Sequence, residues 1–505
     1  MAKPICLVQA AISTRSGYGE HSRDIVRSLI KMDRFDIKII GTRWGDTAYI
    51  NLDTDRDREI FKRMLKEPKL PRKPEIFVHI TVPNEFIQMG QYNIGITAGI
   101  ETTHCSAVWL EGMNRMNMVI VPSKHSKEVF DKTNYTHLDD KTKQPIGTLK
   151  CNVPIEVLFE GVDTSVFHYE SNTLTSVRSE LRGVTESFCF LFVGHWLQGE
   201  LFHDRKDVSG LIKVFLETFK NVPNPPALIL KTSLGTYSVA DRNECTRRIA
   251  IIKKMVATDK PLPNVYLLHG DLTDEEMNGL YNNNKVKAHI SFTKGEGFGR
   301  PLLEASLSRK PVIAPAWSGQ VDFLNKQFSM LLPGQIQKIH PTAVWKDVIV
   351  EESSWFYVNY TIASTVMMNL WRDYNKHKQN ALKQAMFSEQ NFSFNRMHEE
   401  FIKILDKHLP KFEVPDEIVA TIPKLGSIKL PKLKPMVAPT TTPTEIGGLS
   451  APEGMKSIDL PRPPEEHDIA APQGKMENPT EIKEEKPNET ENSGINSGES
   501  APENV

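Results

Sequence analysis

Two successive series of short apolar segments, each followed by a helical pattern, constrain the fold of this chain more than any other feature. The first series begins with PICLVQAAI and ends with PIEVLFEG, and the second runs from FCFLFVG to PVIAP. Continuous apolar strands that alternate with amphipathic helices indicate parallel sheets covered by helices on both faces. The sequence therefore predicts an α/β fold with two doubly wound, Rossmann-like domains.

The chain is long enough for two such domains, because 505 residues exceed what one ordinary hydrophobic core contains. We place the N-terminal domain at 1–165, the second domain at 166–390, a final helix at 391–410 and a tail at 411–505. In doubly wound sheets, ligands bind beyond the carboxyl ends of the strands, where the strand order reverses. Functional residues are therefore expected in the turns that follow the strands.

The tail at 411–505 differs in composition from the rest of the chain. It contains 14 of the 33 prolines, one phenylalanine and neither tryptophan nor tyrosine. Such a segment buries too little apolar surface to offset the entropy of ordering it, so we predict that this Pro/Glu/Lys-rich tail is disordered. Two roles stay open for it, a solvated tether and a docking segment for a partner.

The overall composition excludes several classes of protein. Lys plus Arg (62) nearly cancels Asp plus Glu (63), so no global field attracts nucleic acid or acidic lipid. The five cysteines form no CxxC pair, which favours a reducing compartment over a disulfide framework. The start of the chain does not have the pattern of an export signal, and no apolar run reaches the about 18 residues of a transmembrane segment. We expect a cytoplasmic protein, with peripheral attachment to a membrane left open.

The turn within HISFTKGEGFGRPLLEASLSR, residues 289–309, carries the most informative motif. Gly295, Gly297 and Gly299 lie between a strand and a helix that Pro301 opens. Glycines let a backbone approach a ligand closely, and the amides of a helix N-terminus favour an anion such as a diphosphate. A tight turn without a ligand is the alternative at this point.

Two acids, Glu296 in the turn and Glu304 in the helix, accompany these glycines. A carboxylate accepts paired hydrogen bonds from vicinal hydroxyls, so one acid can hold a ribose and the other a sugar ring. The alternative for Glu304 is an ordinary surface acid.

The stretch from Glu296 to Glu304, followed by RKPVIAPAWSGQVDFL, closely resembles the E-x7-E signature of retaining GT-B glycosyltransferases. This family includes glycogen and sucrose synthases and many bacterial lipopolysaccharide mannosyl- and glucosyltransferases. The resemblance implies that Glu296 lies against the donor sugar as a catalytic residue and that Glu304 binds the ribose. It also implies two domains that face each other across a cleft, with the final helix crossing back onto the first. The donor diphosphate would contact the backbone at 295–300, which includes Phe298 and Arg300.

A second turn supports the same interpretation. The strand FCFLFVG leads to Arg205 and Lys206, and two cations before a helix suit a diphosphate. A solvated charged turn is the alternative, but the pair resembles the basic donor-phosphate motif of the family. The chain departs from the family at His195, where many relatives have arginine. The contact with the diphosphate therefore stays open among His195, Arg205 and Lys206.

The N-terminal half contains a glycine-rich turn, Ser16-Gly17-Tyr18-Gly19, at the start of its first helix. The family has a loop here that reaches toward the donor phosphates and the acceptor. The resemblance assigns Gly17 and Gly19 to the donor and Tyr18 to the acceptor side. A plain helix start is the alternative.

Three further residues of this half are candidates for a role in the site or in the structure. His104 corresponds to a catalytic histidine that many relatives place near the sugar, although a hydrogen-bonded structural role stays open. Glu101 is a candidate acid on the acceptor side. His79, at the end of FVHIT, is expected to be structural.

Other chemistries have no motif in the sequence. HExxH, clustered Cys/His and Asp-x-Asp are absent, so we expect no metal site. A GxSxG nucleophile elbow and a GxxxxGK[ST] phosphate loop are absent as well. We therefore expect no cofactor, with a nucleotide diphosphate sugar as the co-substrate.

The resemblance implies a metal-independent transferase that moves a hexose-type sugar from this donor to an acceptor hydroxyl with retention of anomeric configuration. A glycan, a lipid-linked sugar, a protein and a nucleic acid base all stay open as acceptor. Two alternative functions stay open too. One is a sugar-nucleotide epimerase or phosphorylase on the same scaffold, and the other is a non-catalytic binding module that acts through the tail.

Overall fold

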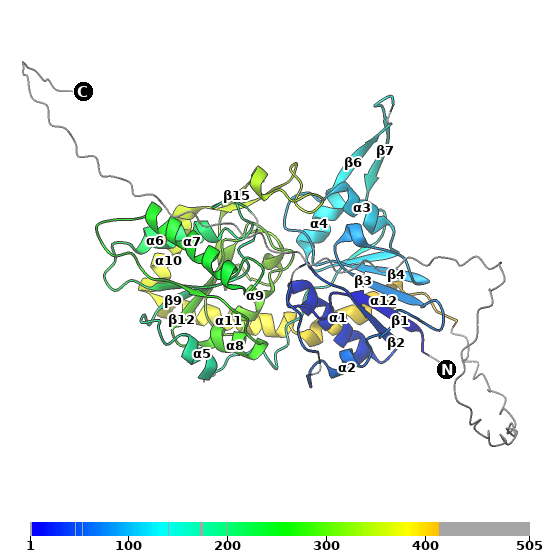
Figure 1. Ribbon diagram of the computed structural model, residues 1–505, viewed down its shortest axis with the longest axis horizontal. Coiled ribbons are helices and arrows are strands. Elements are labelled where there is room, and N and C mark those ends of the chain that lie inside the picture. The colour runs from blue at the N-terminus through cyan, green and yellow to red at the C-terminus, as the bar shows by residue number, and fades with distance from the viewer. Residues whose placement is uncertain are drawn as a thin grey trace, which may run out of the picture. The chain divides into compact units, whose positions relative to one another are not determined.

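A computed structural model describes residues 3–45, 47–52, 54–139, 141–171, 175–197 and 199–413. The tail predicted at 411–505 lies, after its first three residues, outside the described residues. The described part contains two six-stranded sheets whose neighbouring strands all pair in parallel (Figure 1). The predicted α/β class with two Rossmann-like domains is confirmed.

The N-terminal sheet has the strand order β2-β1-β3-β4-β5-β8. Its strands are β1 (Ile5–Ala10), β2 (Asp36–Gly41), β3 (Ile76–Ile80), β4 (Tyr92–Ile96), β5 (Met118–Val121) and β8 (Ile155–Val157). Its helices are α1 (Gly17–Met32), α2 (Arg58–Phe61), α3 (Ala107–Asn114) and α4 (Lys124–Lys132), with the 3-10 helix η1 (Pro83–Glu85). The strand order reverses at β1, so the turn that follows β1 lies at a position where doubly wound sheets bind ligands.

The second sheet has the order β11-β10-β9-β12-β13-β14. Its strands are β9 (Cys189–Val193), β10 (Ala227–Lys231), β11 (Val265–Leu268), β12 (Val286–Ile290), β13 (Val312–Pro315) and β14 (Met330–Leu332). Its helices are α5 (Thr175–Glu180), α6 (Val208–Phe219), α7 (Val239–Met255), α8 (Asp274–Asn282), α9 (Arg300–Ser306) and α10 (Tyr360–Arg372), with η2 (Gly319–Asp322). The order reverses between β9 and β12, which brings the turns after these two strands together.

Two small antiparallel sheets add to this plan. One pairs β6 (Asn134–Leu138) with β7 (Pro145–Lys150) and projects from the N-terminal half in Figure 1. The other pairs β15 (Gly334–Lys338) with β16 (Ser354–Val358), with η3 (Pro341–Ala343) between them. We call residues 334–358 the β15–β16 arm.

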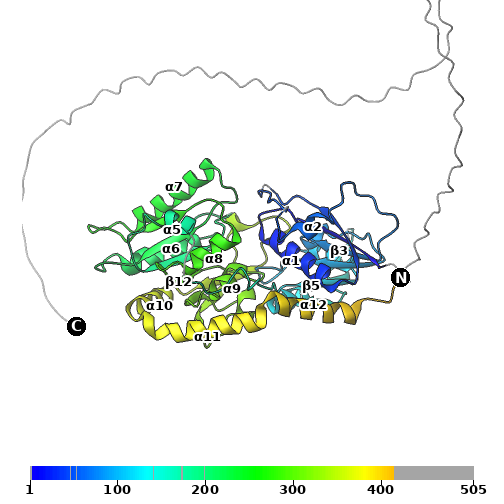
Figure 2. The same ribbon diagram turned by 90° about the horizontal axis from the view of Figure 1, so that it is seen from below.

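The last two helices connect the halves of the molecule. Figure 2 shows α11 (Tyr374–Phe392) and α12 (Phe394–His408) following one another along one side of both sheets. The apolar face of α12 is buried in the hydrophobic core of the N-terminal sheet through Met397, Phe401, Ile404 and Leu405. The chain therefore returns to its first sheet before the described residues end.

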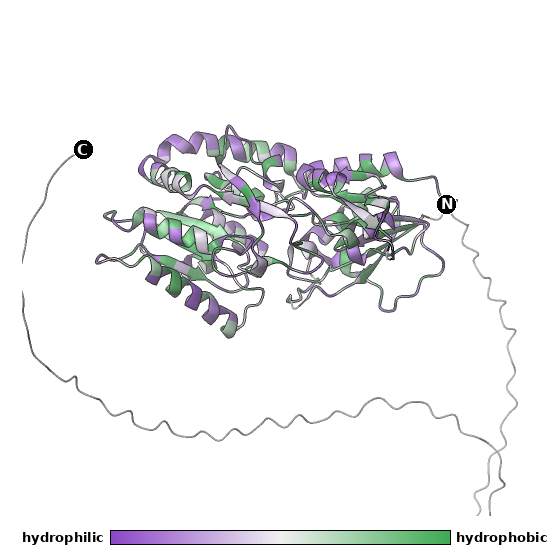
Figure 3. Ribbon diagram, turned by 90° about the horizontal axis from the view of Figure 1, so that it is seen from above, coloured by the Kyte–Doolittle hydropathy of each residue, from purple (hydrophilic) through white to green (hydrophobic). Residues whose placement is uncertain are grey.

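Both sheets are apolar at their centres; in Figure 3 the outer helices have a purple, hydrophilic side, and much of the green, hydrophobic colour lies further inside. The strands β1, β9 and β10 bury nearly every side chain, which explains why they read as continuous apolar runs. Among the described residues, no helix combines the length and the hydrophobicity that crossing a membrane requires.

Candidate active site

The turn between β12 and α9 is fully buried from Ser291 to Gly299. Gly299 has φ +102, a left-handed conformation that favours glycine, and it is the residue from which α9 starts. Among the hydrogen bonds of the described residues, none is donated by the amides of Gly297, Phe298, Gly299 or Arg300. Four consecutive N–H groups at a helix start are thus available to an anion.

Glu296 joins this turn to the basic turn after β9. Lys206 Nζ lies 2.5 Å from one carboxylate oxygen of Glu296, and the Arg205 guanidinium donates to the other at 3.2 Å. Arg205 also donates to the carbonyl oxygen of Gly295 at 2.8 Å. The two motifs predicted independently from the sequence therefore meet at one point, between the strands where the order reverses.

The charge state of Glu296 follows from these neighbours. Burial alone would raise the pKa of this carboxyl, but Lys206 and Arg205 outweigh it and hold the pKa at about 2. The side chains of Glu296 and Lys206 are 9% and 12% exposed, so solvent screens the pair little. Glu296 is thus ionised throughout the physiological pH range.

Glu304 forms the second part of the cluster. It accepts hydrogen bonds from Arg300 Nε at 3.0 Å and from the Tyr281 hydroxyl at 3.2 Å. Burial, together with the carboxylates of Asp274 and Glu20, raises the pKa of Glu304 to about 8 in spite of Arg300. Each oxygen of Glu304 keeps a lone pair for a further donor.

Arg300 reaches from the second domain to the first. Its guanidinium donates to Asp24 on α1 at 2.7 Å and lies 3.7 Å from Glu20. Glu160, in the segment after β8, lies 3.8 Å from the same guanidinium, and burial raises its pKa to about 7. Acids from both domains thus surround one buried cation.

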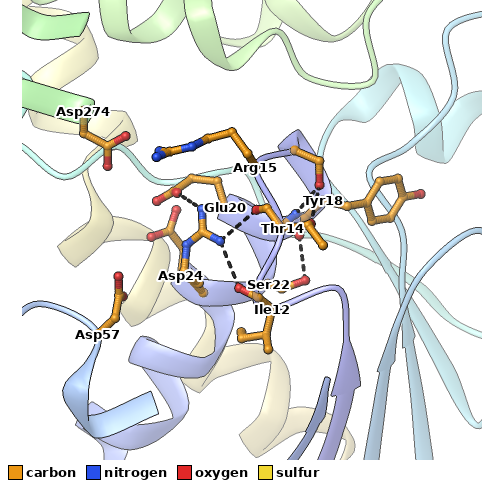
Figure 4. A network of polar contacts seen from close by, with 12 residues as sticks. Ile12, Thr14, Arg15, Tyr18, Glu20, Ser22, Asp24, Asp57 and Asp274 are labelled. Carbon is orange, nitrogen blue, oxygen red and sulfur yellow. Dashed lines mark hydrogen bonds and ion pairs between the residues drawn. The ribbon is translucent and has the colours of Figure 1, made fainter. Parts of the chain in front are cut away.

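Figure 4 shows the N-terminal side of this network. Glu20, Asp24 and Asp57 lie on one side of α1, with Asp274 of the second domain approaching them. Arg56 pairs with Asp274 and also lies 3.7 Å from Glu20. Ion pairs between the domains are therefore concentrated beside the start of α1.

The glycines of the β12–α9 turn have a different immediate partner from the one predicted. A side chain at Gly295 would place its Cβ 1.9 Å from the carbonyl oxygen of Glu101, and one at Gly297 would lie 1.9 Å from that of Ala98. Because Gly295 and Gly297 have no side chains, the backbone of the β12–α9 turn can lie directly against the turn after β4. These contacts bring the carboxyl ends of the two sheets together.

The two glycines of the predicted turn at the start of α1 differ in their surroundings. Ser16 caps the helix by accepting from the amide of Gly19, and Gly19 is packed against Thr14 so closely that a Cβ would clash. Gly17 is exposed, with no atom within 4 Å of where its Cβ would be. The Tyr18 hydroxyl shares a hydrogen bond of 2.9 Å with Thr97, and its ring lies against Trp44.

The structure brings some of the remaining candidates to the cluster and leaves others outside. Glu101 lies 3.7 Å from Arg205, so it is close to Glu296. Burial, with Lys206 nearby, lowers the pKa of His195 to about 4, and its ring shares a hydrogen bond with Ser233. His104 is exposed; its ring shares a hydrogen bond with the neighbouring Thr103, and its carbonyl oxygen accepts from the Thr102 hydroxyl.

Two other predicted residues have apolar surroundings. Phe298 is 2% exposed, and its ring packs against Phe323. Its side chain therefore belongs to the hydrophobic core, and only its backbone N–H belongs to the row of unpaired amides. His79 is buried on β3 between the rings of Phe77 and Phe86, which agrees with a structural role. Among the described residues, no group of three His, Cys, Asp or Glu side chains could hold a metal ion.

Two cavities, of about 920 and 960 Å³, lie away from this cluster. The first is lined by the loops that precede β9, β10 and β11, at the amino edge of the second sheet. The second lies between η2, β14 and α11. Neither contains the charged groups described above, so the candidate site is the cluster at the carboxyl edge.

Solved structures with the same arrangement of two domains show which fold this is. HepE of Anabaena, in complex with UDP and glucose, is 12% identical and matches over 80% of this chain and 100% of its own, with a TM-score of 0.50. Sucrose-phosphate synthase of Thermosynechococcus elongatus is 12% identical, with coverage of 80% and 98% and a TM-score of 0.52. A glycosyltransferase of Rickettsia africae is 14% identical, with coverage of 81% and 100% and a TM-score of 0.52. This chain has the GT-B fold.

At these identities the likeness concerns the fold alone. No protein-family model matches the chain, and no curated protein matches it at the sequence level. In this GT-B fold, the Glu296 cluster lies where the turns after β9 and β12 meet the turn after β4. The role of each residue therefore depends on its contacts in this structure.

Several residues of the cluster carried no signal in the sequence. Asp24 and Glu20 lie on α1 in a charged helical pattern that is typical of a solvated face, yet Asp24 is 1% exposed. Arg56 belongs to no recognisable motif, and Glu160, at the end of the segment PIEVLFEG, had no role assigned to it. Only their positions in the folded chain, Glu160 beside Arg300 and Arg56 beside Glu20, mark them as part of the cluster.

Proposed function

We propose that this protein transfers a hexose-type sugar from a nucleotide diphosphate sugar to an acceptor hydroxyl, with retention and without a metal ion. One observation carries the proposal. The Glu296 carboxylate, two partly buried cations and a row of unpaired amides converge on one turn of a GT-B fold. These groups are suited to binding a diphosphate next to a sugar ring.

The cations supply the chemistry that this transfer needs. Charge develops on the diphosphate as the sugar leaves, and preorganised donors stabilise that charge more in the transition state than in the ground state. Arg205, Lys206 and the amides at 297–300 would hold the diphosphate, a task that a divalent metal performs in other transferases. Glu296 would keep both cations in place and orient the sugar.

The acceptor would approach from the N-terminal domain. Glu101, near Arg205, and Tyr18, at the start of α1, are the candidates for its binding surface. Retention would follow if the acceptor attacks from the face that the diphosphate leaves, with a phosphate oxygen taking its proton. Proton NMR of the newly formed anomeric linkage decides between retention and inversion.

Replacement of Glu304 with alanine is expected to weaken nucleotide diphosphate binding by roughly 10- to 100-fold, because two hydrogen bonds from the ribose to a carboxylate are lost. The nucleotide is first chosen by a thermal-shift screen of UDP, GDP, ADP and dTDP, and its affinity is then measured by calorimetry. Glu186→Ala is the matched control, since Glu186 also accepts from a tyrosine hydroxyl and a side-chain N–H. Equal affinity in wild type and Glu304→Ala would remove the ribose role.

Nucleotide affinity is also expected to depend on pH through Glu304. The pKa of about 8 means that the free carboxyl is mostly protonated at pH 6.5 and ionised at pH 8.5. A ribose that binds the ionised form should therefore bind roughly 10- to 30-fold more tightly at pH 8.5. Calorimetry at both pH values tests this, and Glu304→Gln should remove most of the dependence. A wild-type affinity that falls with pH would contradict the assignment.

Product analysis separates transfer from the other activities of this scaffold. Mass spectrometry of reactions with and without candidate acceptors would show a glycosylated product only for a transferase. An epimerase would convert the nucleotide sugar without an acceptor, a phosphorylase would require phosphate, and a binding module would turn over nothing. We also propose a cytoplasmic location, which suits the five free cysteines.

A further inference from the structure

Lys294 has a side chain that is fully buried in the second domain. Its ammonium donates to the carbonyl oxygens of Phe202 at 2.7 Å and Asp204 at 2.9 Å, and it lies 3.6 Å from the Asp207 carboxylate. All three partners belong to the turn 202–207. One side chain therefore ties down both ends of the turn that carries the two cations of the site.

The backbone of Lys294 adds two further connections. Its amide donates to the carbonyl oxygen of Arg205 at 2.7 Å, and its own carbonyl accepts from Phe356 of β16 at 2.9 Å. The ammonium also lies over the rings of Tyr357 and Trp355, at 4.6 and 5.4 Å from their centroids. This residue thus joins the basic turn, the β12–α9 turn and the β15–β16 arm.

A buried ammonium is costly, so its retention requires compensation. Burial lowers the pKa of Lys294, while Asp207 and Asp204 act in the opposite direction. Burial and the neighbouring Asp207 raise the pKa of Asp204 to about 6. The ammonium thus offsets the negative charge of two buried acids, Asp204 and Asp207, within one tight turn. It also satisfies the carbonyl oxygens of two residues of this turn.

We propose that Lys294 is a positioning residue that fixes the turn 202–207 so that Arg205 and Lys206 both reach Glu296. The contacts support this. Arg205 and Lys206 lie in the chain between Asp204 and Asp207, and Lys294 contacts both of these aspartates. The identity of the ligand rests on the proposed function, but the positioning is a property of the free protein.

Hydrogen exchange of the ligand-free, full-length protein tests the positioning directly. Lys294→Met is expected to accelerate exchange in peptides that cover 201–208 by at least tenfold. Lys285→Met is the matched control, because Lys285 also donates to two carbonyl oxygens of this domain, those of Leu181 and Val184. Unchanged exchange at 201–208 in Lys294→Met, or equal acceleration in the control, would overturn the proposal.

Pyrophosphate binding provides a second measurement that does not depend on the nucleotide base. Calorimetry should show at least tenfold weaker binding in Lys294→Met and partial recovery in Lys294→Arg, which keeps the charge. If wild type binds neither pyrophosphate nor any of UDP, GDP, ADP and dTDP, the proposed function fails while hydrogen exchange still decides the positioning. If Lys294→Met does not fold, Lys294→Gln, which keeps side-chain donors, takes its place in both measurements with the same expected directions.

Discussion

Lys206→Met is expected to lower the rate of sugar transfer by roughly 10²- to 10³-fold, the usual effect of removing one preorganised electrostatic donor. The variant removes the closer of the two cations on Glu296, whose nitrogen lies 2.5 Å from the carboxylate. Arg205 remains, so donor binding should suffer less than the rate. Steady-state kinetics with the donor and acceptor found by mass spectrometry would separate the effects on kcat and KM.

Lys220→Met is the control for this variant. Lys220 forms an ion pair of the same length, 2.5 Å, with Glu217, but on the surface of α6. Surface pairs of this kind contribute little, so its kinetics and stability should match those of wild type. A Lys206→Met protein that keeps a third or more of the wild-type rate would refute the catalytic role.

Gly297→Ala is expected to reduce kcat/KM by roughly 10²-fold while leaving secondary structure intact, because misplacement by about 1 Å is enough for such a loss. The added Cβ would lie 1.9 Å from the carbonyl oxygen of Ala98, and no rotamer relieves a clash between two backbones. The turns after β4 and β12 must therefore separate, which moves Glu296 relative to the N-terminal domain.

Gly183→Ala is the matched glycine variant, since no atom lies within 4 Å of its added Cβ. It should change neither activity nor the circular dichroism spectrum. If Gly297→Ala is equally silent, the close apposition of the two turns is not required for the reaction.

The layout of both sheets could be predicted from the sequence because buried parallel strands have continuous apolar segments with helical patterns between them. The same logic pointed to the turns that carry Glu296, Arg205 and Lys206, because ligands of doubly wound sheets bind beyond the carboxyl ends of the strands. Their meeting within hydrogen-bonding distance required the structure.

Other parts of the site could not be predicted, for identifiable physical reasons. Asp24 and Arg300 are 276 residues apart in sequence, and nothing local indicates that their side chains pair at 2.7 Å. The burial of Lys294 has no local signal, because burial of a lysine depends on carbonyl partners that the sequence does not display. In the β15–β16 arm, β15 (GQIQK) is exposed and polar, so it has no apolar signal, whereas β16 (SWFYV) is apolar and mostly buried.

The glycines show a different limit. A glycine-rich turn signals close approach of some group but not which group approaches. For Gly295 and Gly297 it is the backbone of the other domain, and for Gly19 it is Thr14. A prediction from composition alone could not separate these cases from contact with a phosphate.

The two covalent crossings between the halves lie side by side. Val162, after β8, exchanges backbone hydrogen bonds of 2.9 and 2.8 Å with Phe392 and Phe394, which flank the junction of α11 and α12. If the halves rotate apart to admit a substrate, torsional change can be confined to this paired junction, and both sheets can move as rigid bodies. Opening and closing of the molecule would then depend on a few backbone angles around Val162 and Ser393.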